Sequence, residues 1–115
     1  LDLSGIKSVQ GKNYSFALNV ATTGFYKVTI TASSTQSSLA QIPVTLFLMG
    51  TANGTFTWNG TDGKPVAMEN EVPVFSHFTA VRLYFAQSGL DMHSIKFELV
   101  RPAENLEVAF KKEEV

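Results

Sequence analysis

The chain of 115 residues contains no cysteine. This absence excludes disulfide bonds, thiolate zinc sites and thiol catalysis. Charged residues make up only 17% of the chain, and the formal net charge is -1. Nucleic acid is therefore not an expected partner, because binding it requires a basic surface that displaces counterions. No apolar run approaches the ~20 residues of a membrane-spanning helix, so a membrane partner is not expected either.

What the sequence does contain is a repeated alternation of apolar and polar residues. A period of two is typical of β-strands, and no segment has convincing helical spacing. Turn residues separate the alternating stretches about every ten residues, which predicts an all-β antiparallel β-sandwich. The apolar rows of the predicted strands are Tyr14–Val20, Tyr26–Ala32, Ile42–Leu48, Val81–Phe85, His93–Leu99 and Leu106–Phe110.

The length suits a single domain with its own core. We expect residues 1–110 to form this domain and the charged residues 111–115 to be a tail or a linker. The chain opens within a strand-like pattern, and no signal peptide is visible. We therefore expect a domain excised from a longer protein.

The stretch NGTFTWNGTDG, residues 53–63, holds the only tryptophan, Trp58, on a short predicted strand between two Asn-Gly turns. Two interpretations remain open: the indole is a platform for a ligand, or it plugs the core. Sugar rings present flat C–H faces that pack on indole, whose N–H remains available for a polar partner. The neighbouring Asn53, Asn59 and Asp62 are candidates for hydrogen bonds to sugar hydroxyls, although Asn and Asp before glycine commonly serve the turn itself.

A second candidate surface consists of residues that are out of phase with the predicted core. Successive side chains of a strand point to opposite faces. If Val44, Leu46 and Leu48 face the core, Phe47 faces outward, and Arg82 and Tyr84 do the same on their own strand. These three side chains form one outer patch if the strands share a sheet. The alternatives are a cover from an edge loop or the C-terminal strand, an exposed sugar-stacking surface, or a protein contact.

Signatures of catalysis are missing from the sequence. There is no nucleophile elbow and no phosphate-binding glycine loop. His77 and His93 lie on different segments. His93 belongs to the apolar row of its predicted strand, which favours a buried, hydrogen-bonded structural histidine over a metal ligand. A calcium site would need several oxygen ligands that converge, and nothing in the spacing demands one. The available carboxylates are Asp2, Asp62, Glu69 and Asp91.

Three stretches resemble the β-sandwich carbohydrate-binding modules of the family 6 and 35 type. They are GKNYSFALNVATTGFYKVTITA (11–32), VTLFLMG (44–50) and FTAVRLYFAQSGLDMHSIKFELV (78–100). The resemblance implies a jelly-roll-like fold of the galactose-binding-domain type. Asp91 stands at the position of a sugar-binding asparagine, whereas His93 replaces an aspartate, and the Glu-rich opening strand that accompanies the family's structural calcium is missing.

The resemblance implies a non-catalytic, monomeric carbohydrate-binding module, tethered to a secreted glycoside hydrolase of bacterial type. The implied ligands are β-linked plant cell-wall glycans such as β-glucan, xyloglucan or xylan. The alternative is a structural or adhesive sandwich that packs against a neighbouring domain or protein, and a small hydrolase is the least favoured interpretation. No cofactor is expected. In the carbohydrate-binding interpretation Trp58 is the main stacking platform, and Asn53, Asn59, Asp62 and Asp91 supply hydrogen bonds near the same loop end. Phe47, Arg82 and Tyr84 form the second candidate surface on the sheet face.

Overall fold

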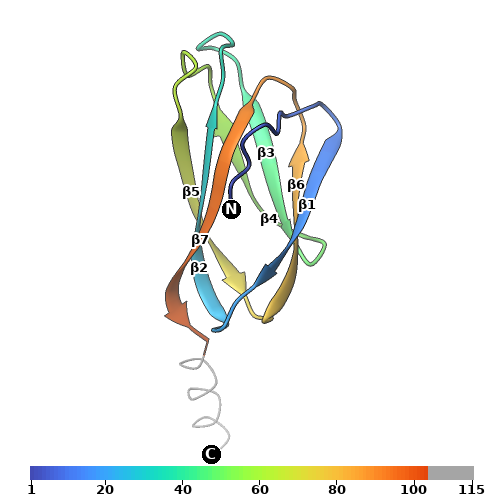
Figure 1. The fold of residues 1–115 in the computed structure, drawn as a ribbon, viewed down its shortest axis with the longest axis vertical. Coiled ribbons are helices and arrows are strands. Elements are labelled where there is room, and N and C mark those ends of the chain that lie inside the picture. The colour runs from blue at the N-terminus through green and yellow to red at the C-terminus, as the bar shows by residue number, and fades with distance from the viewer. Residues whose placement is uncertain (104–115) are drawn as a thin grey trace, which may run out of the picture.

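The computed structural model describes residues 1–103, which form seven β-strands in two antiparallel sheets (Figure 1). One sheet has four strands in the order β1-β6-β3-β4, and the other has three in the order β5-β2-β7. The strands are β1 (Lys12–Asn19), β2 (Gly24–Ser33), β3 (Ile42–Leu48), β4 (Thr51–Trp58), β5 (Val66–Val74), β6 (Phe78–Phe85) and β7 (Asp91–Pro102). This architecture confirms the predicted all-β sandwich.

The connections explain why the two sheets face each other. Only β3 and β4 are consecutive strands that pair within one sheet; every other connection between consecutive strands crosses to the opposite sheet. The β3–β4 hairpin turns through Met49 and Gly50, both at positive φ (51° and 81°). Two residues with positive φ are typical of the tight hairpin turn whose twist matches its strands.

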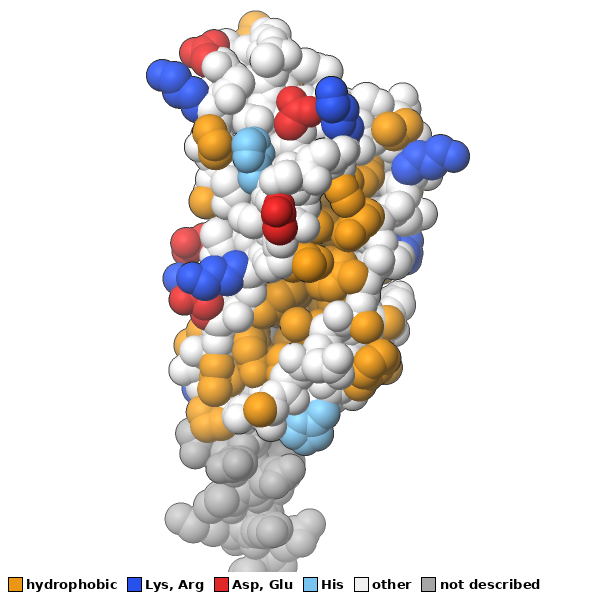
Figure 2. Space-filling view, viewed as in Figure 1, with side chains coloured by type: hydrophobic (Ala, Val, Ile, Leu, Met, Phe, Trp, Pro, Cys, Tyr) orange, Lys and Arg blue, Asp and Glu red, His pale blue; other side chains and the backbone are white. Residues whose placement is uncertain are grey.

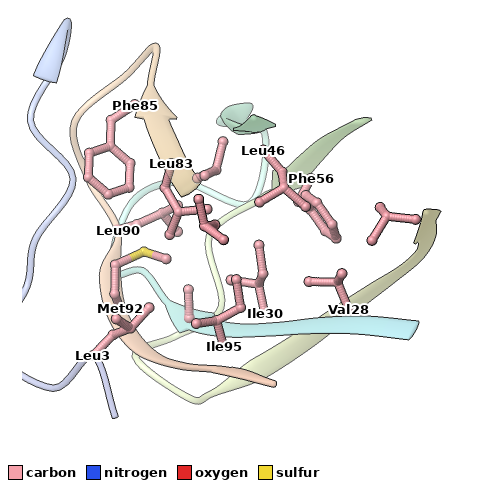
Figure 3. Close-up of a cluster of buried hydrophobic side chains, with 14 of the residues drawn as sticks. Leu3, Val28, Ile30, Leu46, Phe56, Leu83, Phe85, Leu90, Met92 and Ile95 are labelled. Atoms are coloured by element: carbon pink, nitrogen blue, oxygen red, sulfur yellow. The ribbon is translucent and has the colours of Figure 1, made fainter. Parts of the chain in front are cut away.

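The core consists of the inward row of each strand. Rows that were predicted from alternation in β2, β3 and β6 are buried, and Figure 3 shows several of their side chains packed with Leu3 and Leu90. Removal of apolar surface from water stabilises the fold by roughly 25 cal/mol per Å². The buried hydrophobic residues are Leu3, Tyr26, Val28, Ile30, Ala32, Ile42, Val44, Leu46, Leu48, Phe56, Trp58, Val72, Val74, Val81, Leu83, Phe85, Leu90, Met92 and Ile95.

Two features of the strand pattern differ from the sequence prediction. Strand β5 lies in a region expected to be mainly turns, because it is an edge strand with exposed Glu69, Asn70 and Glu71. At the start of β7 a register shift between Thr31 and Ala32 of β2 moves Met92 into the core. A bulge of this kind breaks strict alternation.

The predicted strand Leu106–Phe110 and the predicted tail 111–115 lie outside the described residues. Within residues 1–103, no helix is long and apolar enough to cross a membrane.

Gly60 provides a test of how tightly the connecting loops are packed. A Cβ atom added there would overlap with the backbone carbonyl oxygen of Gln36. We expect Gly60→Ala to lower the free energy of unfolding by about 1–3 kcal/mol, the usual cost of overpacking. Urea denaturation followed by circular dichroism measures the change. The exposed Thr57→Ala on the adjoining strand should stay within about 0.5 kcal/mol of the parent chain, and equal stability of the two variants would contradict the packing described for this loop.

Candidate functional site

Trp58 lies in the core, so its predicted role as an exposed platform is wrong. It stands opposite Ile42 at the end of β4 and has 0% exposure. Its indole Nε1–H donates to the backbone carbonyl of Val66 at 3.0 Å. The buried ring therefore satisfies its polar atom within the protein, as a core tryptophan must. Phe56 faces the same way and is also buried, so neither aromatic of this strand is available for stacking.

The polar residues around Trp58 bond to nearby backbone groups or stand in a turn. The Asn53 amide Nδ2 donates to the carbonyl of Thr51 at 3.0 Å, and that of Asn59 donates to the carbonyl of Ala40 at 2.7 Å. Asp62 has φ 55° and precedes Gly63 in an exposed turn. The position of Asp62 matches the common structural use of Asp before glycine at turns, and the two asparagines use their amides on the backbone of this chain.

These polar residues do not form one constellation. Asn53 lies near the β3–β4 hairpin, whereas Asn59 follows the opposite end of β4. Six residues of extended chain separate them by about 20 Å. Asp91 begins β7 in the other sheet and forms an exposed ion pair with Lys7, with 3.7 Å between Oδ1 and Nζ. The prediction that Asn53 joins the other three at a single loop end is therefore wrong.

The predicted patch of Phe47, Arg82 and Tyr84 is brought together on one sheet. Arg82 lies directly opposite Phe47 in the β3–β6 ladder, and Tyr84 lies opposite Thr45. All three side chains point away from the core and are partly exposed. We call this surface the outer face of the four-stranded sheet.

Arg82 is held at the centre of the outer face by two contacts. Its guanidinium carbon lies 3.9 Å from the centroid of the Phe47 ring. Its Nη1 donates to Asn13 Oδ1, at 2.9 Å, from the neighbouring strand β1. Arginine has five N–H donors in a planar fork. The Asn13 contact uses one nitrogen and fixes the plane of the guanidinium over the aromatic ring.

Further residues of this face were missed by sequence reasoning. Phe78 is 59% exposed and shares the phase of Arg82 and Tyr84 on β6, a signal that the sequence already contained. Thr45 and Thr55 face each other across β3 and β4, with their hydroxyl oxygens 3.2 Å apart. A shallow hollow of about 330 Å³ adjoins Arg82. Its lining includes Ser15, Ala17, Gly50, Phe78, Ala80 and Arg82.

The two outer faces of the sandwich differ sharply in charge. By strand register, the outward positions of the four-stranded sheet among residues 1–103 include a single charged side chain, Arg82. The outer face of the three-stranded sheet contains exposed ion pairs. They are Lys27–Glu69, Lys27–Glu98, Lys96–Glu98 and Arg101–Glu71. Only the four-stranded sheet therefore presents aromatic rings among neutral hydroxyl and amide groups.

No metal centre is assembled by the described residues. Across residues 1–103, no three His, Asp or Glu side chains are close enough to hold a metal ion. Asp2 accepts hydrogen bonds from the side chain and the backbone N–H of Ser4, which hold the pKa of its carboxyl below the usual value. His93 Nε2 lies 2.8 Å from Ser33 Oγ, which matches the predicted structural histidine. The carboxylates that could have served calcium do not converge, so the residues described do not fit the calcium site that the family resemblance raised.

No protein-family model matches the chain. A curated β-glucosidase from Ruminococcus albus is 56% identical over 105 residues, covering 90% of this chain and 11% of that protein. The chain thus spans about a tenth of the length of this relative.

Solved structures share the fold at low sequence identity. The CBM36-1 domain of a multidomain xylanase from the hindgut metagenome of Trinervitermes trinervoides has a TM-score of 0.67 and 17% identity, covering 82% of this chain and 76% of that one. A family 35 carbohydrate binding module from an environmental isolate has a TM-score of 0.67 and 13% identity, covering 84% and 74%. The chain therefore has the β-sandwich fold of carbohydrate-binding modules, as the resemblance predicted.

The buried position of Trp58 generates a stability prediction. Trp58→Ala removes a large core side chain and leaves the Val66 carbonyl without its indole donor. We expect a loss of about 3–5 kcal/mol in the free energy of unfolding, measured by urea denaturation. Trp58→Phe keeps much of the apolar volume and should cost less. An alanine variant as stable as the parent chain would be incompatible with the buried position.

Proposed function

We propose that this domain is a non-catalytic carbohydrate-binding module that binds a polysaccharide on the outer face of its four-stranded sheet. The observation that carries the proposal is the contrast between the two outer faces. One is covered with exposed ion pairs, and the other combines Phe47, Tyr84 and Phe78 with neutral polar groups and a single cation. Exposed aromatic groups on an otherwise polar surface commonly mark a binding site.

The chemistry of this face suits a pyranose chain. The rings of Phe47 and Tyr84 offer apolar surfaces to the C–H faces of the sugars. Asn13, Arg82 and the Thr45–Thr55 pair supply donors and acceptors to hydroxyl groups at the rim. Phe78 and Tyr84 are six residues apart on β6, or about 20 Å of extended strand. That length suits several consecutive sugar units better than a single one.

A rigid sheet favours a site at which each individual contact with the ligand is weak. The side chains of the outer face are fixed by the strands and by the Phe47–Arg82–Asn13 contacts. Little ordering is then required on binding, which limits the entropic cost. The loop-end residues Asn59, Asp62 and Asp91 remain a secondary candidate for hydrogen bonds to sugar, whereas Trp58 is withdrawn as the stacking platform and Asn53 lies apart from that end.

The relatives support a role beside a glycoside hydrolase. The Ruminococcus albus protein is a β-glucosidase, and one structural neighbour belongs to a multidomain xylanase. We infer that the domain belongs to a secreted bacterial enzyme and holds it on β-linked plant cell-wall glycans such as β-glucan, xyloglucan or xylan. Tethering of this kind raises the local concentration of substrate around the catalytic domain.

A structural role against a neighbouring domain is the second candidate, and it is favoured by a separate surface. Phe75 is 57% exposed and meets Phe25 edge to face, with ring centroids 5.3 Å apart. Beside it, a hollow of about 390 Å³ is lined by Met49, Pro73 and Phe75, among others. This surface lies at the hairpin end of the sandwich, so the two candidate functions can be tested by different substitutions.

Substitution of the outer aromatics tests the proposed function. We expect Phe47→Ala and Tyr84→Ala each to weaken polysaccharide binding by about 1–2 kcal/mol, as truncation of aromatic anchors does elsewhere. Affinity electrophoresis on gels that contain β-glucan, xyloglucan or xylan measures the loss. Urea denaturation of each variant shows separately whether the sandwich remains folded.

Phe75→Ala is the control, because it removes an aromatic side chain that is even more exposed, at the hairpin end and away from the outer face. It should leave retardation unchanged. If Phe75→Ala weakens binding and the outer-face variants do not, the site is at the hairpin end. If no polysaccharide retards the parent chain, the domain is a structural sandwich and the proposed function is wrong.

A further inference from the structure

Both arginines of the chain lie over phenylalanine rings, one on each outer face of the sandwich. Arg82 stands opposite Phe47 in the β3–β6 ladder, with its guanidinium carbon 3.9 Å from the ring centroid. Arg101 stands opposite Phe25 in the β2–β7 ladder, at 4.1 Å. A guanidinium that packs on an aromatic ring keeps its N–H groups at its edge for hydrogen bonds in its own plane. The two sheets therefore present the same cation in the same way.

The two arginines differ in the acceptor that each guanidinium contacts. Arg101 Nη1 lies 3.2 Å from Oε1 of Glu71, so a carboxylate neutralises its charge. Arg82 Nη1 donates to Oδ1 of Asn13 at 2.9 Å, and this amide is neutral. No carboxylate of residues 1–103 forms an ion pair with Arg82. The same arrangement thus includes a protein carboxylate on the three-stranded sheet and an uncharged amide on the four-stranded sheet.

The surroundings of Arg82 leave its positive potential in place. Figure 2 shows positive and negative side chains next to one another on the side of the molecule viewed there. Arg82 is instead partly buried among the neutral outward rows of β1, β3 and β4. A charge in such surroundings attracts an anion more strongly than a fully solvated charge does. The opposite outer face contains Glu69, Glu71 and Glu98, which would repel an anion.

The hollow beside Arg82 allows a side group of a ligand to reach it. Its volume is about 330 Å³, and ligand sites occupy about 300–1,000 Å³. Ala17 and Ala80, which pair across β1 and β6, belong to its lining together with Ser15. Phe78 and Arg82 also line it, four residues apart on β6, or about 13 Å of extended strand. Small side chains between the ring and the guanidinium thus leave a depression in the sheet surface.

We infer that Arg82 recognises a carboxylate of the glycan, so that the outer face prefers a β-linked polysaccharide that bears uronic acid units. This preference rests on the proposed function and specifies the class of polysaccharide. The guanidinium fork matches the two oxygens of a carboxylate, and such charge-assisted pairs are short and directional. Phe47 and Asn13 hold the fork in place. Phe78 offers an apolar surface to the sugar ring that bears the carboxylate.

Affinity electrophoresis with two forms of one polysaccharide tests this preference. Native glucuronoxylan and the same polymer after chemical reduction of its carboxyl groups share a backbone and differ in charge. We expect the parent chain to bind the native polymer about tenfold more tightly, as one charge-assisted contact of modest strength would provide. Migration is compared with that of a reference protein that binds neither polymer.

Substitution of each arginine identifies the group responsible. Arg82→Gln removes the charge and keeps a donor, so this variant should bind the native and the reduced polymer equally. Arg82→Lys keeps the charge without the planar fork and should retain only part of the preference. The matched control is Arg101→Gln, which removes the other arginine that lies over a phenylalanine and should retain the full preference. Urea denaturation of each variant shows whether the sandwich remains folded.

Different results would overturn the carboxylate preference and the proposed function. Equal retardation of the parent chain by both forms of the xylan, or retardation by β-glucan alone, overturns the preference and leaves the proposed function standing. A preference for the native polymer that persists in Arg82→Gln also overturns the role of Arg82. If β-glucan, xyloglucan and both forms of the xylan all fail to retard the parent chain, the proposed function is wrong and the carboxylate preference is wrong with it.

Discussion

Each strand of the sandwich has to hide one row of side chains against the opposing sheet, and the rest of the structure depends on this constraint. Because the period of a strand is two, burial of one row fixes the direction of the other. Leu46 and Leu48 face the core, so Phe47 must face outward. Val81, Leu83 and Phe85 are buried, so Arg82 and Tyr84 must also face outward. The composition of the outer face of the four-stranded sheet is thus a geometric consequence of the core.

The same constraint explains why the only tryptophan cannot bind a ligand. Trp58 follows Phe56 on the inward row of β4, and its N–H is used by the carbonyl of Val66. Asn53-Gly54 lies within β4 at a register shift against β3, and Asn59-Gly60 follows the end of the strand, so neither raises the indole into solvent. A large aromatic side chain on a short strand is therefore buried in the core when it lies on the inward row of that strand.

Two surfaces of the sandwich differ in the groups that they present. The outer face of the four-stranded sheet is uncharged apart from Arg82 among the described residues, and contacts with Phe47 and Asn13 hold that arginine in place. The side between β1 and β7 has a hollow lined mainly by apolar side chains, among them Leu1, Phe16 and Phe97. The difference arises because the first surface is the outward row of a sheet, whereas the second is an inward row that the opposing sheet covers incompletely.

The sequence by itself determined the fold class, the inward rows of β2, β3 and β6, and the outward phase of Phe47, Arg82 and Tyr84. These features follow from local alternation, which is visible along the chain. Only the tertiary structure decided that β3 and β6 are neighbours, that Met92 is buried through a bulge, that polar β5 is an edge strand, and that Asn53 and Asn59 lie at opposite ends of β4. It also decided the burial of Trp58. Alternation shows on which side of the strand the indole lies, whereas exposure to solvent depends on whether the opposing sheet covers that side.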